Sequence, residues 1–152
     1  MSAPMRVLHC IYDDPGNPWV AGGGAHRLRE IYPRLTDRVD AVVATGSYPG
    51  ARDEVIGGVR YRRLGARGPY AWSRLTYARA ATRLVAAGGY DVGIFDFSAY
   101  TPIRIPRNGP VGMVVHMLHG TTAPDRFGRV LGEVVRRSEL RSLRRGRWIT
   151  TQ

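Results

Sequence analysis

The 152-residue chain contains no lysine and only one cysteine. All 23 of its Lys and Arg positions are therefore arginine, and we attach no functional meaning to that choice. Because a single cysteine cannot pair within the chain, Cys10 rules out an intrachain disulfide. This composition fits a protein of a reducing compartment.

Long apolar runs are missing as well. No stretch reaches the roughly 20 apolar residues that cross a bilayer, and the N-terminus lacks the basic and then apolar pattern of a signal peptide. We therefore expect a cytoplasmic protein that is either soluble or attached peripherally to the inner face of the membrane.

Two nucleotide-binding motifs are also absent. Without G-x-x-x-x-G-K-[ST], the chain is not a P-loop nucleotidase. The dinucleotide fingerprint G-x-G-x-x-G is missing too, and Ala44-Thr45-Gly46 stands where that fold places an acidic residue. The sequence therefore disfavours a nicotinamide-dependent dehydrogenase.

The charge that is present is strongly positive, with a formal net charge of +11. Such an excess of positive charge predicts affinity for an acidic partner. The candidate partners are nucleic acid, an anionic membrane surface and a phosphorylated substrate. The arginines are not interleaved with aromatic residues as in stacking platforms, and no DNA- or RNA-binding motif accompanies them. Specific binding of nucleic acid is therefore not expected.

Short apolar runs alternate with amphipathic stretches, which predicts an α/β fold of Rossmann type with a mainly parallel sheet. Val59, Tyr61 and Leu64 alternate with arginines, so their strand is expected at an exposed sheet edge. Pro33 lies within the first helix and is expected to kink it or end it early. Strands are expected at residues 5–11, 39–45, 59–64, 91–97, 111–116 and 148–151, a loop at 46–58, and helices at 24–36, 72–87 and 125–145.

The helix at 125–145 is expected to be amphipathic. Its buried face is expected to comprise Phe127, Val130, Leu131, Val134 and Val135. Its other face carries Arg129, Arg136, Arg137, Arg141 and Arg144. Together with Arg60, Arg62 and Arg63, these arginines are interpreted either as solvated surface or as a contact with anionic lipid.

The glycine run Gly22, Gly23 and Gly24 follows the first strand and opens a helix. At the carboxyl edge of a parallel sheet, bare N–H groups and a positive helix end bind phosphates or sugars. The alternative interpretation of the glycine run is a flexible loop before the helix. His26, in the first helical turn, is a candidate to reach the same cleft. Arg27 is expected on the helix face turned away from the core.

Two other strands end in polar residues at the same edge. His116 ends the fifth strand, and His119 follows it. For an imidazole in this place three roles stay open: binding a substrate, transferring a proton, or making only structural hydrogen bonds. Asp96 ends the fourth strand and either binds a sugar hydroxyl or caps a turn. Because the His-x-x-His spacing has no clear third ligand, we expect neither a metal nor a cofactor.

Three residues near the first strand receive structural interpretations. His9 is expected to be a core residue whose hydrogen bonds are satisfied. Asp13 and Asp14 come after the strand and are assigned mainly to a turn with Pro15-Gly16, with the cleft as the alternative.

In order and spacing, these segments resemble the N-terminal half of a GT-B glycosyltransferase, which has two facing Rossmann-like domains. The closest pattern is the retaining group called glycosyltransferase family 4. The resemblance covers almost the whole chain and is carried by MRVLH (5–9), GGAHR (23–27), VDAVVAT (39–45), GVRY (58–61), DVGI (91–94), VVH (114–116) and WITT (148–151).

The resemblance implies that residues 1–152 belong to the acceptor-side domain of a hexosyltransferase. Such an enzyme moves a sugar from a nucleotide-sugar donor to a hydroxyl acceptor with retention of configuration and without an obligatory metal. The resemblance also places His116 at the reaction centre, where it positions or stabilises groups rather than acting as a free general base. The candidate substrate-binding residues are Gly22, Gly23, Gly24, His26, Asp96 and His119.

Two departures from the family pattern bear on activity. The family often has Glu at the place of His26, and its donor-binding C-terminal domain has no counterpart in these residues. We therefore expect an incomplete domain, from a longer or a split enzyme, that transfers no sugar without a donor-binding partner. The alternatives are a non-catalytic binding subunit of a split glycosyltransferase and a basic nucleic-acid-binding α/β module.

Overall fold

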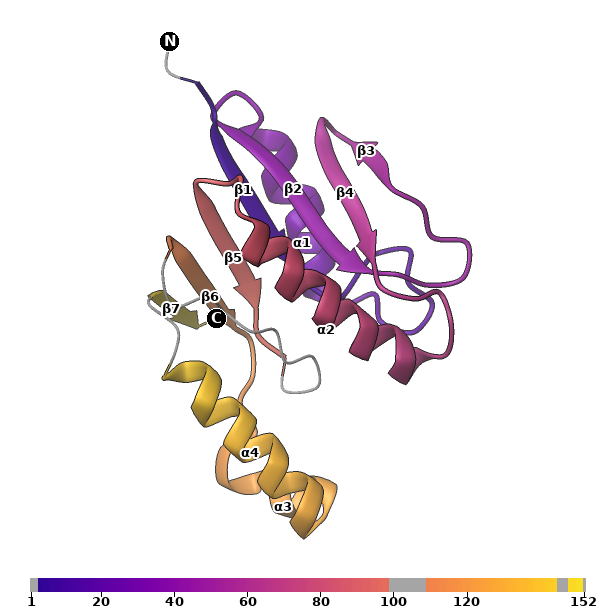
Figure 1. Cartoon of the computed structure of the whole chain (residues 1–152), viewed down its shortest axis with the longest axis vertical. Coiled ribbons are helices and arrows are strands. Elements are labelled where there is room, and N and C mark those ends of the chain that lie inside the picture. The colour runs from indigo at the N-terminus through magenta and orange to yellow at the C-terminus, as the bar shows by residue number, and fades with distance from the viewer. Residues whose placement is uncertain (1–2, 99–108, 145–147, 152) are drawn as a thin grey trace.

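The structure is a computed structural model that describes residues 3–98, 109–144 and 148–151 (Figure 1). Across these ranges, no helix is long and apolar enough to cross a membrane. The elements are β1 (Met5–Cys10), α1 (Gly23–Ile31), the 3-10 helix η1 (Tyr32–Leu35), β2 (Val39–Gly46), β3 (Glu54–Ile56), β4 (Val59–Leu64), α2 (Tyr70–Ala87), β5 (Val92–Asp96), β6 (Val111–Val115), the 3-10 helix η2 (Gly120–Thr122), α3 (Ala123–Phe127), α4 (Arg129–Leu143) and β7 (Trp148–Thr151).

The strands form one sheet in the order β3-β4-β2-β1-β5-β6-β7. Neighbouring strands run parallel, except for β3 and β4. The predicted α/β class with a mainly parallel sheet is therefore confirmed. Because β1, β5 and β6 are parallel neighbours, their carboxyl ends meet at one edge of the sheet.

Helices cover both faces of the sheet around β1. Val7 packs with Leu28 and Tyr32 in one core cluster, beneath α1 and η1. Its neighbour Leu8 packs with Tyr77 in the other cluster, beneath α2. Since successive strand residues point to opposite faces, both faces of β1 are buried, which explains why the adjacent residues Val7 and Leu8 are both apolar.

Pro33 ends α1 early, as the sequence predicts. The α-helix stops at Ile31, and Tyr32–Leu35 continue as a 3-10 turn. A proline lacks the N–H of the helical hydrogen bond, and its ring clashes with the preceding turn. The stop of α2 is also confirmed, because Gly88 follows Ala87 with φ 70°, a left-handed conformation that favours glycine.

The predicted sheet edge is wrong. The strand β4 is covered by β3, which pairs with it antiparallel and places Ile56 opposite Val59. Gly57 and Gly58 connect the two strands with φ of 55° and 79°, the conformation of a two-residue hairpin turn. The segment expected to be a loop at 46–58 therefore contains the edge strand, whose three residues are too few to show an alternating pattern.

The predicted last helix is divided in two. Gly128, with φ 80°, separates α3 from α4. A side chain at Gly132 would overlap the backbone of Pro124, so the missing side chain lets the two helices pack directly on each other. Figure 1 shows this helical pair projecting beyond the edge of the sheet.

This arrangement overturns the predicted buried face of the last helix. Val130, Leu131 and Val134 are 83%, 53% and 58% exposed. Among the four predicted positions whose side chains the structure describes, only Val135 is buried, since α4 turns Gly132, Val135 and Glu139 inward. The side chain of Phe127 lies outside the described residues. The misprediction arises because α4 packs against α3 and η2.

Of the three β4 arginines that the lipid-contact interpretation grouped with those of α4, the structure removes Arg63. Arg60 pairs with Asp40 at 2.8 Å. The side chain of Arg63 is only 2% exposed and points into the protein. Of these three β4 arginines, only Arg62 is exposed without a described ion pair.

Candidate functional site

A cavity of about 580 Å³ opens at the carboxyl ends of β1, β5 and β6, beside the start of α1. Ligands of open α/β sheets bind at this edge, because loops and helix N-termini converge there. The lining residues are Ile11, Tyr12, Asp13, Val20, Gly23, Gly24, Tyr70, Arg74, Asp96, Phe97, Ser98, His116, Met117 and His119.

Gly24 lets the first turn of α1 lie against the end of the sheet. A Cβ at this position would come within 2.9 Å of Ile11 Cδ1 and 3.4 Å of Asp96 Oδ2. At Gly23 nothing lies within 4 Å of such an atom, so that position faces open space. No side chain caps the helix at Gly22. The first N–H groups of α1 are thus bare of side-chain caps beside the cavity.

Asp96 is the centre of a buried hydrogen-bond network, with its side chain only 4% exposed. Its Oδ1 accepts a hydrogen bond from Nε2 of His9 at 2.8 Å, and its Oδ2 accepts from Nε2 of His116 at 2.7 Å. Arg27 donates to the same Oδ2 at 3.0 Å. The expectation that Arg27 turns away from the core is therefore wrong.

These contacts determine the charge of Asp96. Burial raises the pKa of the carboxyl, but the hydrogen bonds from His9 and His116 and the charge of Arg27 outweigh it, so the pKa is lowered. An ionised carboxylate only accepts hydrogen bonds, so both imidazoles must present Nε2–H to it. The Nδ1 atom of His9 lies 2.7 Å from the Tyr32 hydroxyl, which confirms His9 as a satisfied core residue. Among the described residues, the Nδ1 atom of His116 has no hydrogen-bond partner.

Five of the seven candidate site residues line the cavity together, namely Gly23, Gly24, Asp96, His116 and His119. Gly22 precedes the first turn of α1 and is not among the lining residues. His26 is exposed on α1 and does not line the cavity either. The convergence at the sheet edge follows from parallel topology alone, whereas the side of α1 on which His26 lies depends on packing.

Glu139 of α4 holds the turn that carries His119. This carboxylate is only 2% exposed, and it accepts hydrogen bonds at 2.8 Å from the backbone N–H groups of both His119 and Gly120. Sequence reasoning missed this residue because α4 was expected to bury its valines and leucines. No signal in the sequence distinguishes it, because α4 has a second glutamate, Glu133, which pairs with Arg136 and Arg137.

The opposite wall of the cavity comes from α2, and no motif pointed to it. The guanidinium of Arg74 lies over the ring of Tyr12 at 4.3 Å and over that of Tyr70 at 5.2 Å. It also donates to the Tyr70 hydroxyl at 3.0 Å. The Tyr12 hydroxyl in turn donates to Ser73 at 3.1 Å, so the stacked guanidinium rests on a fixed ring.

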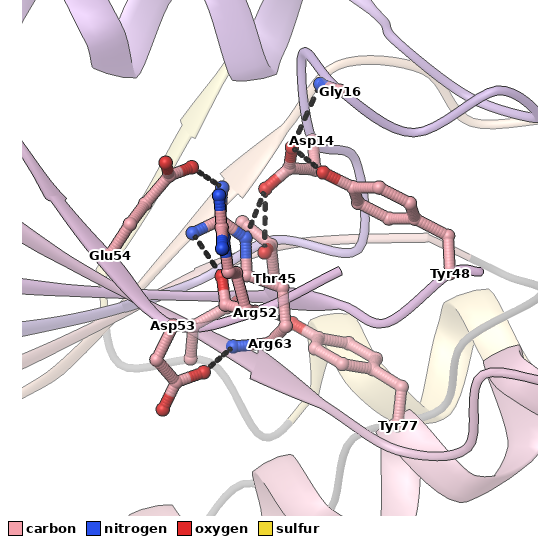
Figure 2. Close-up of polar contacts among 10 residues, drawn as sticks. Asp14, Gly16, Thr45, Tyr48, Arg52, Asp53, Glu54, Arg63 and Tyr77 are labelled. Atoms are coloured by element: carbon pink, nitrogen blue, oxygen red, sulfur yellow. Dashed lines mark hydrogen bonds and ion pairs between the residues drawn. The ribbon is translucent and has the colours of Figure 1, made fainter. Parts of the chain in front are cut away.

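The adjacent residues Asp13 and Asp14 point to different environments. Asp13 lines the cavity, and burial raises its pKa, with the charge of Arg74 acting in the opposite direction. Figure 2 shows Asp14 within a separate network, where its Oδ2 accepts from Nε of Arg63 at 3.0 Å. Its Oδ1 accepts from the N–H of Gly16 at 2.8 Å, as the predicted turn requires.

Within the described ranges, no three His, Cys, Asp or Glu side chains form a group able to hold a metal ion. No protein-family model matches the chain, and no curated protein matches it in sequence.

Proposed function

We propose that this chain is the acceptor-binding, Rossmann-like domain of a retaining GT-B glycosyltransferase. The enzyme moves a sugar from a nucleotide-sugar donor to a hydroxyl acceptor, and a donor-binding domain or subunit supplies the rest of its active site. One observation carries the proposal: the glycine start of α1 meets His116, held by Asp96, in a cavity at the carboxyl edge of the sheet.

The glycine start of α1 supplies the phosphate-facing side of the site. Helix N-termini attract anions through their bare N–H groups and the helix dipole. Gly23 and Gly24 have no side chains to keep a donor's phosphates away from these groups, and Gly23 faces open space. The role assigned to this turn is to stabilise the leaving phosphate as the bond to the sugar breaks.

His116 supplies the acceptor-facing side. Its Nε2–H is committed to Asp96, so the Nδ1 atom receives the hydrogen bond of an acceptor hydroxyl. In a front-face reaction the leaving phosphate takes the proton of that hydroxyl. His116 then orients the nucleophile, and its fixed geometry lowers the entropic part of the barrier.

The test is a nucleotide-release assay with a panel of nucleotide sugars. It compares the chain alone with the chain mixed with a donor-binding domain, supplied as the product of the neighbouring gene. We expect nucleotide release only in the mixture. This release is expected to be lost when the His116→Ala variant takes the place of the unsubstituted chain. Sugar transfer by the chain alone, or transfer in the mixture that survives His116→Ala, would contradict the proposal.

A further inference from the structure

The hydrogen-bond network behind His116 continues away from the cavity, across the face of the sheet that α1 and η1 cover. Its members are Tyr32 of η1, His9 of β1 and Asp96 of β5, and all of them are buried. The hydroxyl of Tyr32 lies 2.7 Å from Nδ1 of His9, whose Nε2 lies 2.8 Å from Oδ1 of Asp96. The other carboxylate oxygen, Oδ2, meets Nε2 of His116 at 2.7 Å. A single chain of contacts therefore joins the imidazole at the cavity to a tyrosine that does not line it.

The Tyr32 hydroxyl determines which nitrogen of His9 carries the proton. An ionised Asp96 only accepts hydrogen bonds, so His9 must present Nε2–H to Oδ1. A neutral His9 then has a lone pair at Nδ1, which accepts the O–H of Tyr32. In the opposite tautomer the Nε2 lone pair would face the carboxylate. In either that tautomer or a cationic ring, Nδ1–H would leave the buried Tyr32 proton without its described acceptor. The hydroxyl therefore selects the tautomer of His9 that serves Asp96.

His9 in turn fixes the direction and the charge of the Asp96 carboxylate. Among the described residues it is the only donor to Oδ1, since Arg27 and His116 share Oδ2. Burial raises the pKa of this carboxyl, and the hydrogen bond from His9 is the strongest of the contacts that lower it. Without that donor the carboxyl would rotate or take up a proton, and a protonated carboxyl donates as well as accepts. His116 could then turn a bare Nε2 to Asp96 and carry its proton on Nδ1.

We propose that His9 and Tyr32 are positioning residues, which act through Asp96 to keep the proton of His116 on Nε2 and its Nδ1 as an acceptor. The inference rests on the proposed function for its conclusion that this nitrogen orients the nucleophile. It gives a role in the site to two buried residues that do not line the cavity. If they served packing alone, their replacement would change the stability of the fold but not the tautomer of His116.

Nitrogen-15 NMR of the histidine rings, recorded on the purified labelled chain at mildly alkaline pH, shows which nitrogen carries each proton. In the unsubstituted chain we expect His116 to favour Nε2–H by about tenfold or more, because hydrogen bonds to charged groups are the stronger ones. His9→Phe keeps a ring but removes both nitrogens, and we expect it to give a mixture of the two His116 tautomers. His9→Gln retains an amide N–H that can reach the carboxylate in place of Nε2–H, and we expect it to preserve the Nε2–H tautomer of His116.

Two tyrosine variants separate positioning from packing, and they decide the matter if His9→Phe does not fold. Tyr32→Phe removes only the hydroxyl that selects the tautomer of His9, and we expect it to shift the ring nitrogens of both His9 and His116. Tyr77→Phe is the matched control. It removes a buried hydroxyl beneath α2, which donates to the carbonyl of Ala44 at 3.0 Å, and is expected to leave both imidazoles unchanged.

Two results would overturn the inference: an undiminished preference of His116 for Nε2–H in folded His9→Phe, or the same ring shifts, or none, in both tyrosine variants. Because the tautomers are read on the chain alone, either result leaves the proposed function standing. The nucleotide-release assay judges that function separately.

Discussion

Asp13 and Asp14 show how two identical residues, adjacent in the chain, acquire opposite roles. Asp14 is fully buried and is paired with Arg63, whose side chain is only 2% exposed. Asp13 faces the cavity without a described partner. A DD pair before Pro-Gly predicts a turn, but only the packing of β2 and β4 beside it determines which carboxylate is buried.

At Arg63 we expect a large loss of stability. Arg63→Ala leaves the Asp14 carboxylate buried without its cation, and such a change costs about 3–5 kcal/mol. Urea unfolding measures the free energy of unfolding. Arg62→Ala, on the exposed side of the same strand, is the control, with an expected change within about 0.5 kcal/mol. Equal effects of the two substitutions would show that the network of Figure 2 contributes little.

At Asp13 we expect a gain of stability when the carboxylate is replaced by a neutral amide. Burial raises the pKa of its carboxyl in the folded protein, so folding opposes its ionisation. The folded state binds the proton more tightly than the unfolded state, and stability from this group falls as pH rises through the interval between the two pKa values. Asp13→Asn should therefore raise the melting temperature near neutral pH.

The sign of the pH dependence provides the check. The stabilisation by Asp13→Asn should disappear below the ordinary pKa range of aspartate, where the carboxyl is protonated in both states. Thermal unfolding of both proteins across a pH series measures it. A gain that grows as the pH falls would mean that Asp13 is stabilised as a carboxylate in the folded protein.

Among the elements, the α3–α4 pair depends on one absent side chain. Alanine in place of Gly132 improves helix propensity by about 1 kcal/mol, but its Cβ would overlap the backbone of Pro124. Overpacking of this kind costs about 1–3 kcal/mol. We therefore expect Gly132→Ala to lower the melting temperature, whereas Ser138→Ala on the same helix should leave it unchanged or raise it. A stabilised Gly132→Ala protein would mean that the helices separate freely.

The longer elements were predictable because their signals are local. Apolar runs predict β1, β2, β5 and β6, and Pro33 predicts the early end of α1. The edge strand β3 was missed because three residues show no periodicity. The exposed face of α4 was missed because the partner of an amphipathic helix is set by tertiary packing, which here is α3.

Across the whole molecule, the sheet order explains why part of the site was predictable. Parallel neighbours bring the residues after β1, β5 and β6 to one edge, so Gly24, Asp96 and His116 could be grouped from the sequence. Asp13 follows β1 closely, and the cleft was the alternative interpretation for it. Arg74 and Glu139 could not be grouped, because each acquires its role from a contact between distant elements. Their types are common, and no spacing distinguishes them from surface residues.

Backbone NMR of the isotope-labelled chain, titrated with neutral monosaccharides as polyol probes, is the most direct measurement of whether this edge is an acceptor site. We predict amide shifts concentrated at the cavity, at Gly23, Gly24 and Asp96, with no change along the exposed arginines of α4. Shifts confined to Arg137 and Arg141, produced by random-sequence DNA and abolished by salt while the polyols leave the cavity unchanged, would contradict the glycosyltransferase proposal and favour a basic nucleic-acid-binding module.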